Sequence, residues 1–142
     1  MRKSNLLVFD DFMVGSVIGT GPVYTRQDLN APLGAYDIVA VQIVVDKSSA
    51  TPFILGVLQQ HSADAQNWVD KTTILTLDTT IVSGPPWSTM GADATGVPSL
   101  AFVRFALSFT SGTPTARVRL YATLRDQGAG SSGLQAPVAP LG

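Results

Sequence analysis

The chain contains no cysteine and no glutamate, and lysine occurs only at Lys3, Lys47 and Lys71. The lack of cysteine excludes a disulfide framework and thiol chemistry. Glutamate and lysine favour helices and are depleted in strands, so their scarcity favours a β protein. Charged residues make up 13% of the chain, about half of the usual share. Low surface charge is typical of a subunit that stays within an assembly, although a small β domain with a serine- and threonine-coated surface explains the composition equally well.

Long apolar runs are also missing. No stretch approaches the ~20 apolar residues that cross a bilayer, so we expect neither a membrane span nor a membrane partner. Arg2 and Lys3 precede the apolar residues Leu6–Phe9, as in a signal peptide, but this run is short and Asp10 ends it. We therefore expect no signal peptide.

Residues for catalysis or metal binding are scarce. The one histidine is His61, followed by Ser62 and Asp64, but residues adjacent in sequence do not have the geometry of a catalytic triad. We expect His61 at a strand end with its ring facing solvent. Zinc sites need paired cysteine or histidine ligands, and calcium loops need spaced carboxylates, which the adjacent Asp10 and Asp11 do not match. No phosphate-binding glycine loop is present. The sequence predicts no enzyme, no catalytic residue, no cofactor and no metal.

Residues 99–126 contain two long alternating runs joined by Ser111–Pro114. Side chains of a strand point alternately to opposite faces, so period two predicts one buried face and one face that is wet or covered by a partner. In the second run one face carries Ala116, Val118, Leu120, Ala122 and Leu124, and the other carries Arg117, Arg119, Tyr121, Thr123 and Arg125. Glycine and proline in the connection are typical of a hairpin loop, which predicts an antiparallel pair.

Further strands are expected upstream, with turn signals between them. We predict strands at residues 36–46, 52–61, 68–76 and 79–82, a hairpin loop at 47–51, a turn at 62–68 and a long loop at 83–98 that contacts another molecule. Several short strands of this kind predict an all-β, antiparallel β-sandwich or jelly-roll-like domain over residues 36–126. Its expected core is Val41, Ile43, Phe53, Leu55, Trp68, Val103, Phe105, Leu107, Val118 and Leu120.

Both ends of the chain differ from this domain. Residues 1–35 combine short apolar pieces with many glycines and prolines, and we expect an N-terminal arm that lies along a neighbour outside the core. Residues 127–142 are rich in glycine, serine and proline, which predicts a flexible tail, either disordered or docking through its apolar residues. The expected interaction residues are Leu6, Leu7, Val8, Phe9, Phe12, Trp87, Leu134, Val138 and Leu141.

Two groups of surface residues leave alternatives open. Arginines interleaved with Tyr121 are typical of a nucleic-acid surface, but the net charge is −1, so we do not expect nucleic acid as a partner. We favour ion pairs from Arg117, Arg119 and Arg125 to Asp37, Asp46 or a neighbouring subunit. Trp68 fits a residue that caps the core and Trp87 fits an interface. Both tryptophans fit a sugar-binding face equally well, so carbohydrate stays open as a ligand.

Three motifs together resemble a known family. The turn Ser62–Trp68 has the form Ser-x-Asp-Gly-x-x-Trp, with Ala65 in place of glycine. A later strand carries Phe102-Val103-Arg104, and the loop Ser111–Pro114 follows. Over residues 36–126 this pattern resembles small β-sandwich structural proteins of tailed-phage virions, and it is also similar to carbohydrate-binding jelly rolls. The alanine leaves the turn type open.

The resemblance implies a structural protein of a tailed-phage particle. Arms at both ends suit a head decoration (cement) subunit that clasps neighbours, binds the major capsid protein or other virion subunits, and forms a homo-oligomer. Its expected location is the virion, assembled in the host cytoplasm. A neck or tail structural protein and a carbohydrate-binding module are the alternatives, and an enzyme ranks last.

Overall fold

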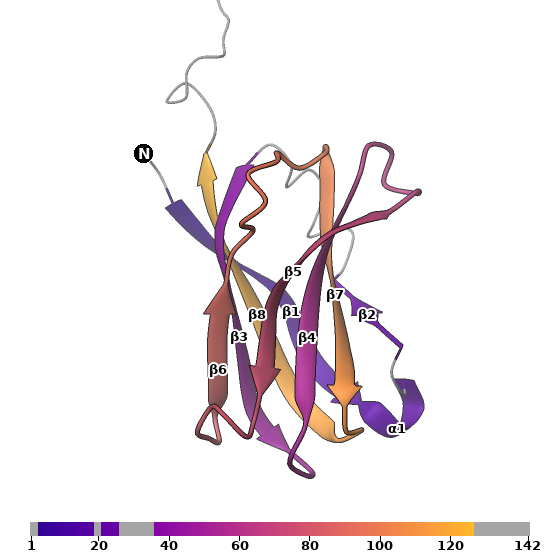
Figure 1. The fold of residues 1–142 in the computed structure, drawn as a ribbon, viewed down its shortest axis with the longest axis vertical. Coiled ribbons are helices and arrows are strands. Elements are labelled where there is room, and N and C mark those ends of the chain that lie inside the picture. The colour runs from indigo at the N-terminus through magenta and orange to yellow at the C-terminus, as the bar shows by residue number, and fades with distance from the viewer. Residues whose placement is uncertain (1–2, 19–20, 26–35, 127–142) are drawn as a thin grey trace, which may run out of the picture.

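The computed structural model describes residues 3–18, 21–25 and 36–126, which form two antiparallel four-stranded sheets packed face to face (Figure 1). The expected all-β sandwich is therefore confirmed. In the described ranges no helix is long and apolar enough to cross a bilayer. The elements in chain order are β1 (Lys3–Val14), α1 (Gly15–Ile18), β2 (Val23–Tyr24), β3 (Tyr36–Ser48), β4 (Ile54–Ser62), β5 (Val69–Asp78), β6 (Trp87–Gly91), β7 (Phe102–Ser111) and β8 (Thr115–Asp126).

The strands pair in a nested order. One sheet has the order β1-β8-β3-β6 and the other has β2-β7-β4-β5. The first strand thus pairs with the last, the second with the seventh, the third with the sixth and the fourth with the fifth. The loops β4–β5 and β6–β7 lie at one end of the sandwich, and the loops β3–β4, β5–β6 and β7–β8 lie at the other (Figure 1).

Two predicted hairpins are wrong. Residues 47–51 and 111–114 join strands in different sheets, because β3 and β8 belong to one sheet while β4 and β7 belong to the other. Alternation in sequence shows which side chains share a face, but it does not show which strand lies alongside. Of the predicted turns between strands, the one at 62–68 does connect a paired hairpin, formed by β4 and β5.

The region from residue 79 to residue 98 also differs from the prediction. Residues 79–82 form a turn, in which the carboxylate of Asp78 accepts hydrogen bonds from the backbone N–H and the hydroxyl of Thr80 (2.9 and 2.7 Å). The predicted long loop contains β6, which pairs with β3 from Val41↔Gly91 to Val45↔Trp87. The sequence does not reveal this five-residue strand for two reasons. Prolines and glycines surround it, and its apolar pattern is too short to show a period.

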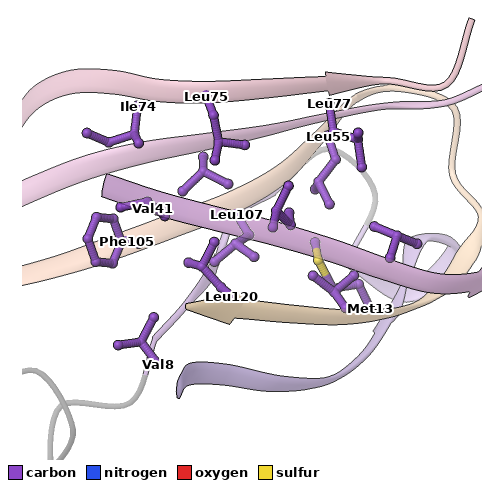
Figure 2. Packing of buried hydrophobic residues seen from close by; sticks show 14 of the residues in the cluster. Val8, Met13, Val41, Leu55, Ile74, Leu75, Leu77, Phe105, Leu107 and Leu120 are labelled. Atoms are coloured by element: carbon purple, nitrogen blue, oxygen red, sulfur yellow. The ribbon is translucent and has the colours of Figure 1, made fainter. Parts of the chain in front are cut away.

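The core lies between the two sheets. Figure 2 shows Val8, Met13 and Leu120 from one sheet facing Leu55 and Leu107 from the other. The predicted core residues are buried, with the exception of Trp68, which is half-buried at the surface. Those confirmed are Val41, Ile43, Phe53, Leu55, Val103, Phe105, Leu107, Val118 and Leu120.

The prediction that residues 1–35 lie outside the core is wrong for residues 3–14. These residues form β1, which pairs with β8 from Lys3↔Arg125 to Val14↔Thr115 and buries Val8 and Met13 completely or nearly so. A register shift between Leu7 and Phe9 breaks the alternation, which is why the sequence does not read as a strand. The predicted tail at 127–142 lies outside the described residues.

Candidate functional site

The predicted interaction residues of β1 point in opposite directions. Leu7 and Phe12 are exposed (37% and 48%), on the outer face of their sheet. Val8 is fully buried, and Leu6 and Phe9 are partly buried against the core. Two residues of the predicted set are therefore available for contact, and the other three stabilise the sandwich. Leu134, Val138 and Leu141 lie outside the described residues.

The burial of the two tryptophans differs from the prediction. Trp87 is 6% exposed and contacts Phe53 within the core, so its prediction as an interaction residue is wrong. Trp68 is half-buried and lies over the guanidinium of Arg104, with 4.4 Å from Cζ to the ring centroid. Trp87 turns inward because it pairs with Val45, whose side chain faces the core.

The outer face of the β1-β8-β3-β6 sheet carries charges that are matched locally. Arg119 donates to both carboxylate oxygens of Asp46 (2.9 and 2.7 Å) and to the hydroxyl of Tyr121 (2.8 Å). The hydrogen bonds from Arg119 lower the pKa of Asp46, and those to Asp46 and Tyr121 raise the pKa of Arg119. Arg117 forms an ion pair with Asp10. The predicted pairing of the arginine face is confirmed for Arg119 and Asp46.

Strand β1 leaves one side of its backbone without a strand partner among the described residues. The ring of Phe12 lies toward the neighbouring strands, with the Cζ of Arg117 in β8 at 5.5 Å and the Nζ of Lys47 in β3 at 5.7 Å from its centroid. A twelve-residue strand that lacks a second partner in the described part of the chain, with Leu7 and Phe12 exposed, is a ready template for strand addition by another chain.

The other sheet carries a different cluster on its outer face, centred on Arg104. Its guanidinium lies between two aromatic rings, with Cζ 3.8 Å from the centroid of Tyr24 and 4.4 Å from that of Trp68. Arg104 Nε donates to Gln60 Oε1 (2.7 Å), and Gln60 Nε2 donates to Asp70 Oδ1 (2.7 Å). Desolvation by burial lowers the pKa of Arg104. The five residues form what we call the Arg104 cluster.

Sequence reasoning missed the Arg104 cluster. In the sequence, Arg104 stands out only as part of the motif Phe102-Val103-Arg104, and Tyr24 belongs to the predicted N-terminal arm. The register places Gln60 opposite both Arg104 and Asp70, and β2 lies beside β7 with Tyr24 opposite Ala106. An outward-facing arginine near aromatic residues was the available signal, but only the strand order brings these distant positions together.

Residues 61–65 have structural roles. Asp64 Oδ1 accepts hydrogen bonds from the N–H groups of Gln66 and Asn67 (2.9 and 2.8 Å) and from the hydroxyl of Ser62 (2.8 Å). His61 Nδ1 accepts from the N–H of Leu100 (3.1 Å), so its half-buried ring holds a loop, which corrects the expected solvent-facing ring. These groups form no triad. No cluster of three metal-binding side chains occurs in the described part of the chain.

The loop at 92–101 is fastened to the sandwich. Lys71, whose side chain is 4% exposed, forms an ion pair with Asp93 and donates to Thr95 (2.8 Å). Gln59, also buried, donates to Ser99 (3.0 Å). These contacts hold residues 93–99 against the sandwich.

A hollow of about 330 Å³ lies at the end of the sandwich that carries the β5–β6 loop. It is lined by Thr51, Thr79, Thr80, Ile81, Val82, Ser83, Gly84 and Trp87. This lining contains hydroxyl groups and apolar side chains but no acid, base or cation, so it offers no group for general acid–base catalysis.

No family model, no curated protein and no solved structure matches this chain. The β1 edge and the Arg104 cluster are the two surface features that point to a function.

Proposed function

We propose that this chain is a non-enzymatic structural subunit of a phage particle, most specifically a decoration subunit of the head. The observation that carries the proposal is the long edge of β1, which has no second strand partner within residues 3–18, 21–25 and 36–126, together with the exposed residues Leu7 and Phe12. Such an edge is an aggregation hazard in a free monomer and a binding surface in an assembly. The low share of charged residues agrees with a protein that is covered by neighbours.

The strand order supports the jelly-roll part of this proposal. The nested pairing of first with last, second with seventh, third with sixth and fourth with fifth is the order expected when one long antiparallel hairpin rolls into two sheets. Jelly rolls occur in viral capsid proteins and in lectins. Because one fold serves many functions, the choice between them rests on the β1 edge and on the resemblance of the turn Ser62–Trp68.

The proposed mechanism is strand addition at β1. A partner strand laid against this edge satisfies the open backbone N–H and C=O groups, and Leu7 and Phe12 give the contact its apolar part. Each contact is modest, but identical subunits around a shell add their contacts through multivalency. This arrangement needs no titratable group.

Charge placed on the β1 face tests the mechanism. We expect the double variant Leu7→Lys/Phe12→Lys to stay folded and to lose self-association in sedimentation velocity runs, because lysine on an edge strand opposes strand addition. Met90→Lys is the matched control, since Met90 is 66% exposed on β6, the opposite edge strand of the same sheet. A protein that is monomeric at all concentrations, or a double variant that associates like the parent, contradicts the proposal.

Location within the particle is tested separately. Particles banded in a density gradient should contain the chain, and antibody gold should label the head surface in electron micrographs. Label at the neck or along the tail would replace decoration by the alternative virion role. A chain that never bands with particles would remove the virion role altogether.

A further inference from the structure

We propose that the outer face of the β2-β7-β4-β5 sheet binds a carboxylate-bearing sugar, with the Arg104 cluster as the site. This inference goes beyond the structural role proposed above and does not depend on it, because the β1 edge belongs to the other sheet. Its basis is the combination of a fixed cation, two aromatic rings and a carboxylate on one face.

Arg104 is held in place before any ligand arrives. The rings of Tyr24 and Trp68 both pack over its guanidinium, and Gln60 accepts from its Nε. Neither Nη atom makes a hydrogen bond to any of the residues that the structure describes, and no ion pair is formed there. The free end of the fork therefore presents parallel N–H donors in the plane of the guanidinium.

A carboxylate fits this end of the arginine. Planar N–H groups in a rigid fork match the two oxygens of a carboxylate, which makes the contact both charged and directional. The rings of Tyr24 and Trp68 exclude water from the guanidinium faces, and an ion pair is stronger where solvent is partly excluded. Partial burial of Arg104 lowers its pKa.

The rest of the Arg104 cluster favours a sugar over an acidic peptide. Asp70 accepts from Gln60 through Oδ1 and keeps Oδ2 for a further donor. Gln60 is opposite both Arg104 and Asp70, and its amide group joins Arg104 Nε to Asp70 Oδ1, so the carboxylate of Asp70 stands beside the arginine site. A run of acidic side chains would meet repulsion there. A sugar acid brings hydroxyl donors for Asp70 and a carboxylate for Arg104.

The aromatic rings supply the apolar part of the site. Tyr24 is 41% exposed, so part of its ring is available to stack against the C–H face of a pyranose. Binding sites of this kind combine aromatic walls with a few placed polar groups.

Isothermal titration with oligogalacturonate tests the proposal, with the matched neutral galactose oligomer and hexaglutamate peptide as comparisons. We expect the uronate to bind at least tenfold more tightly than either. Arg104→Met should abolish this preference and Arg104→Lys should keep only part of it, because lysine lacks the fork. Arg117→Met, on the other sheet, is the control that should bind as the parent does.

Further variants separate the site from a loss of fold. Trp68→Ala should weaken all sugar binding, and Asp70→Asn should weaken binding of the neutral oligomer as well as the uronate. Circular dichroism and the urea midpoint establish that each variant is folded. The proposal is overturned if the uronate shows no binding at millimolar concentration, if Arg104→Met binds it unchanged, or if hexaglutamate binds more tightly. Titration of Leu7→Lys/Phe12→Lys should give the parent affinity, so failure of either proposal leaves the other standing.

Discussion

Trp87 meets Phe53 edge to face, with ring centroids 5.6 Å apart and planes at 81°. Phe53 in turn meets Phe109 at 5.8 Å and 89°. Trp87 belongs to β6 in one sheet and Phe109 to β7 in the other. The three rings therefore join the two sheets through contacts that edge-to-face geometry favours.

Because Trp87 belongs to this chain of rings and Trp68 does not, the two tryptophans are expected to contribute unequally to stability. Trp87→Ala should lower the free energy of unfolding by about 3–5 kcal/mol, because it removes a buried aromatic side chain and leaves a cavity. Trp68→Ala should cost about 1 kcal/mol, since the ring is half-buried and mainly loses its contact with Arg104. Urea unfolding followed by tyrosine fluorescence measures both. Equal losses would contradict the assignment.

Ala65 predicts a stabilising substitution. Its φ is 61°, in the left-handed region that side chains other than glycine rarely adopt. Ala65→Gly removes this strain. Glycine also gives the unfolded chain more conformational freedom, which offsets part of the gain, so the free energy of unfolding should rise by about 1 kcal/mol. Ala63→Gly in the same turn, where φ is not positive, should give no gain. Thermal unfolding of the three proteins compares them.

Gly91 of β6 lies against the backbone of β5, which belongs to the other sheet. A Cβ on Gly91 would overlap the carbonyl oxygen of Ile74 in β5. We expect Gly91→Ala to lower the free energy of unfolding by about 1–3 kcal/mol or more, because backbone must move. At Gly56 the nearest atoms lie at 3.6 and 4.0 Å, so Gly56→Ala should be tolerated. Denaturant midpoints that fall equally in both would contradict this reading.

Acid should weaken the fold partly through Asp64. Backbone N–H groups of Asn67 and Gln66, with the side chains of Asn67 and Ser62, hold its pKa well below the usual range. A carboxyl whose folded pKa is depressed stabilises the fold above its unfolded pKa of about 3.9, and this contribution is lost as pH falls through the folded value. The stability advantage of the parent over Asp64→Asn should therefore be largest near neutral pH and shrink below about pH 4. Urea unfolding across pH measures it, and a pH-independent gap would contradict it.

Removal of residues 1–14 should prevent folding. The deletion exposes the β8 edge and removes Val8 and Met13 from the core. A synthetic peptide of residues 1–14, added in trans, should restore the β signal in circular dichroism, because it can pair with β8 as β1 does. A truncated chain that folds alone would show that this strand is dispensable, as an arm would be.

Sequence alone was enough for the fold class and for most of the core. Alternation in the segments now seen as β3, β4, β7 and β8 marks a buried face at each strand, because side chains of a strand alternate in direction whatever lies beside it. The same pattern predicted the outward arginines, and with them the pairing of Arg119 with Asp46. Turn chemistry likewise located the β4–β5 connection.

Tertiary structure decided which strands are neighbours, and with that the candidate sites. The cluster around Arg104 forms for two reasons. Strand β2, which carries Tyr24, lies beside β7, and Trp68, directly before β5, reaches across β4 to Arg104. Strand β1 joins the core because β8 offers it an edge, and its bulge conceals the period in sequence. Side-chain direction is a local property of the backbone. Strand partnership is set by the packing of the whole chain, and no local pattern carries it.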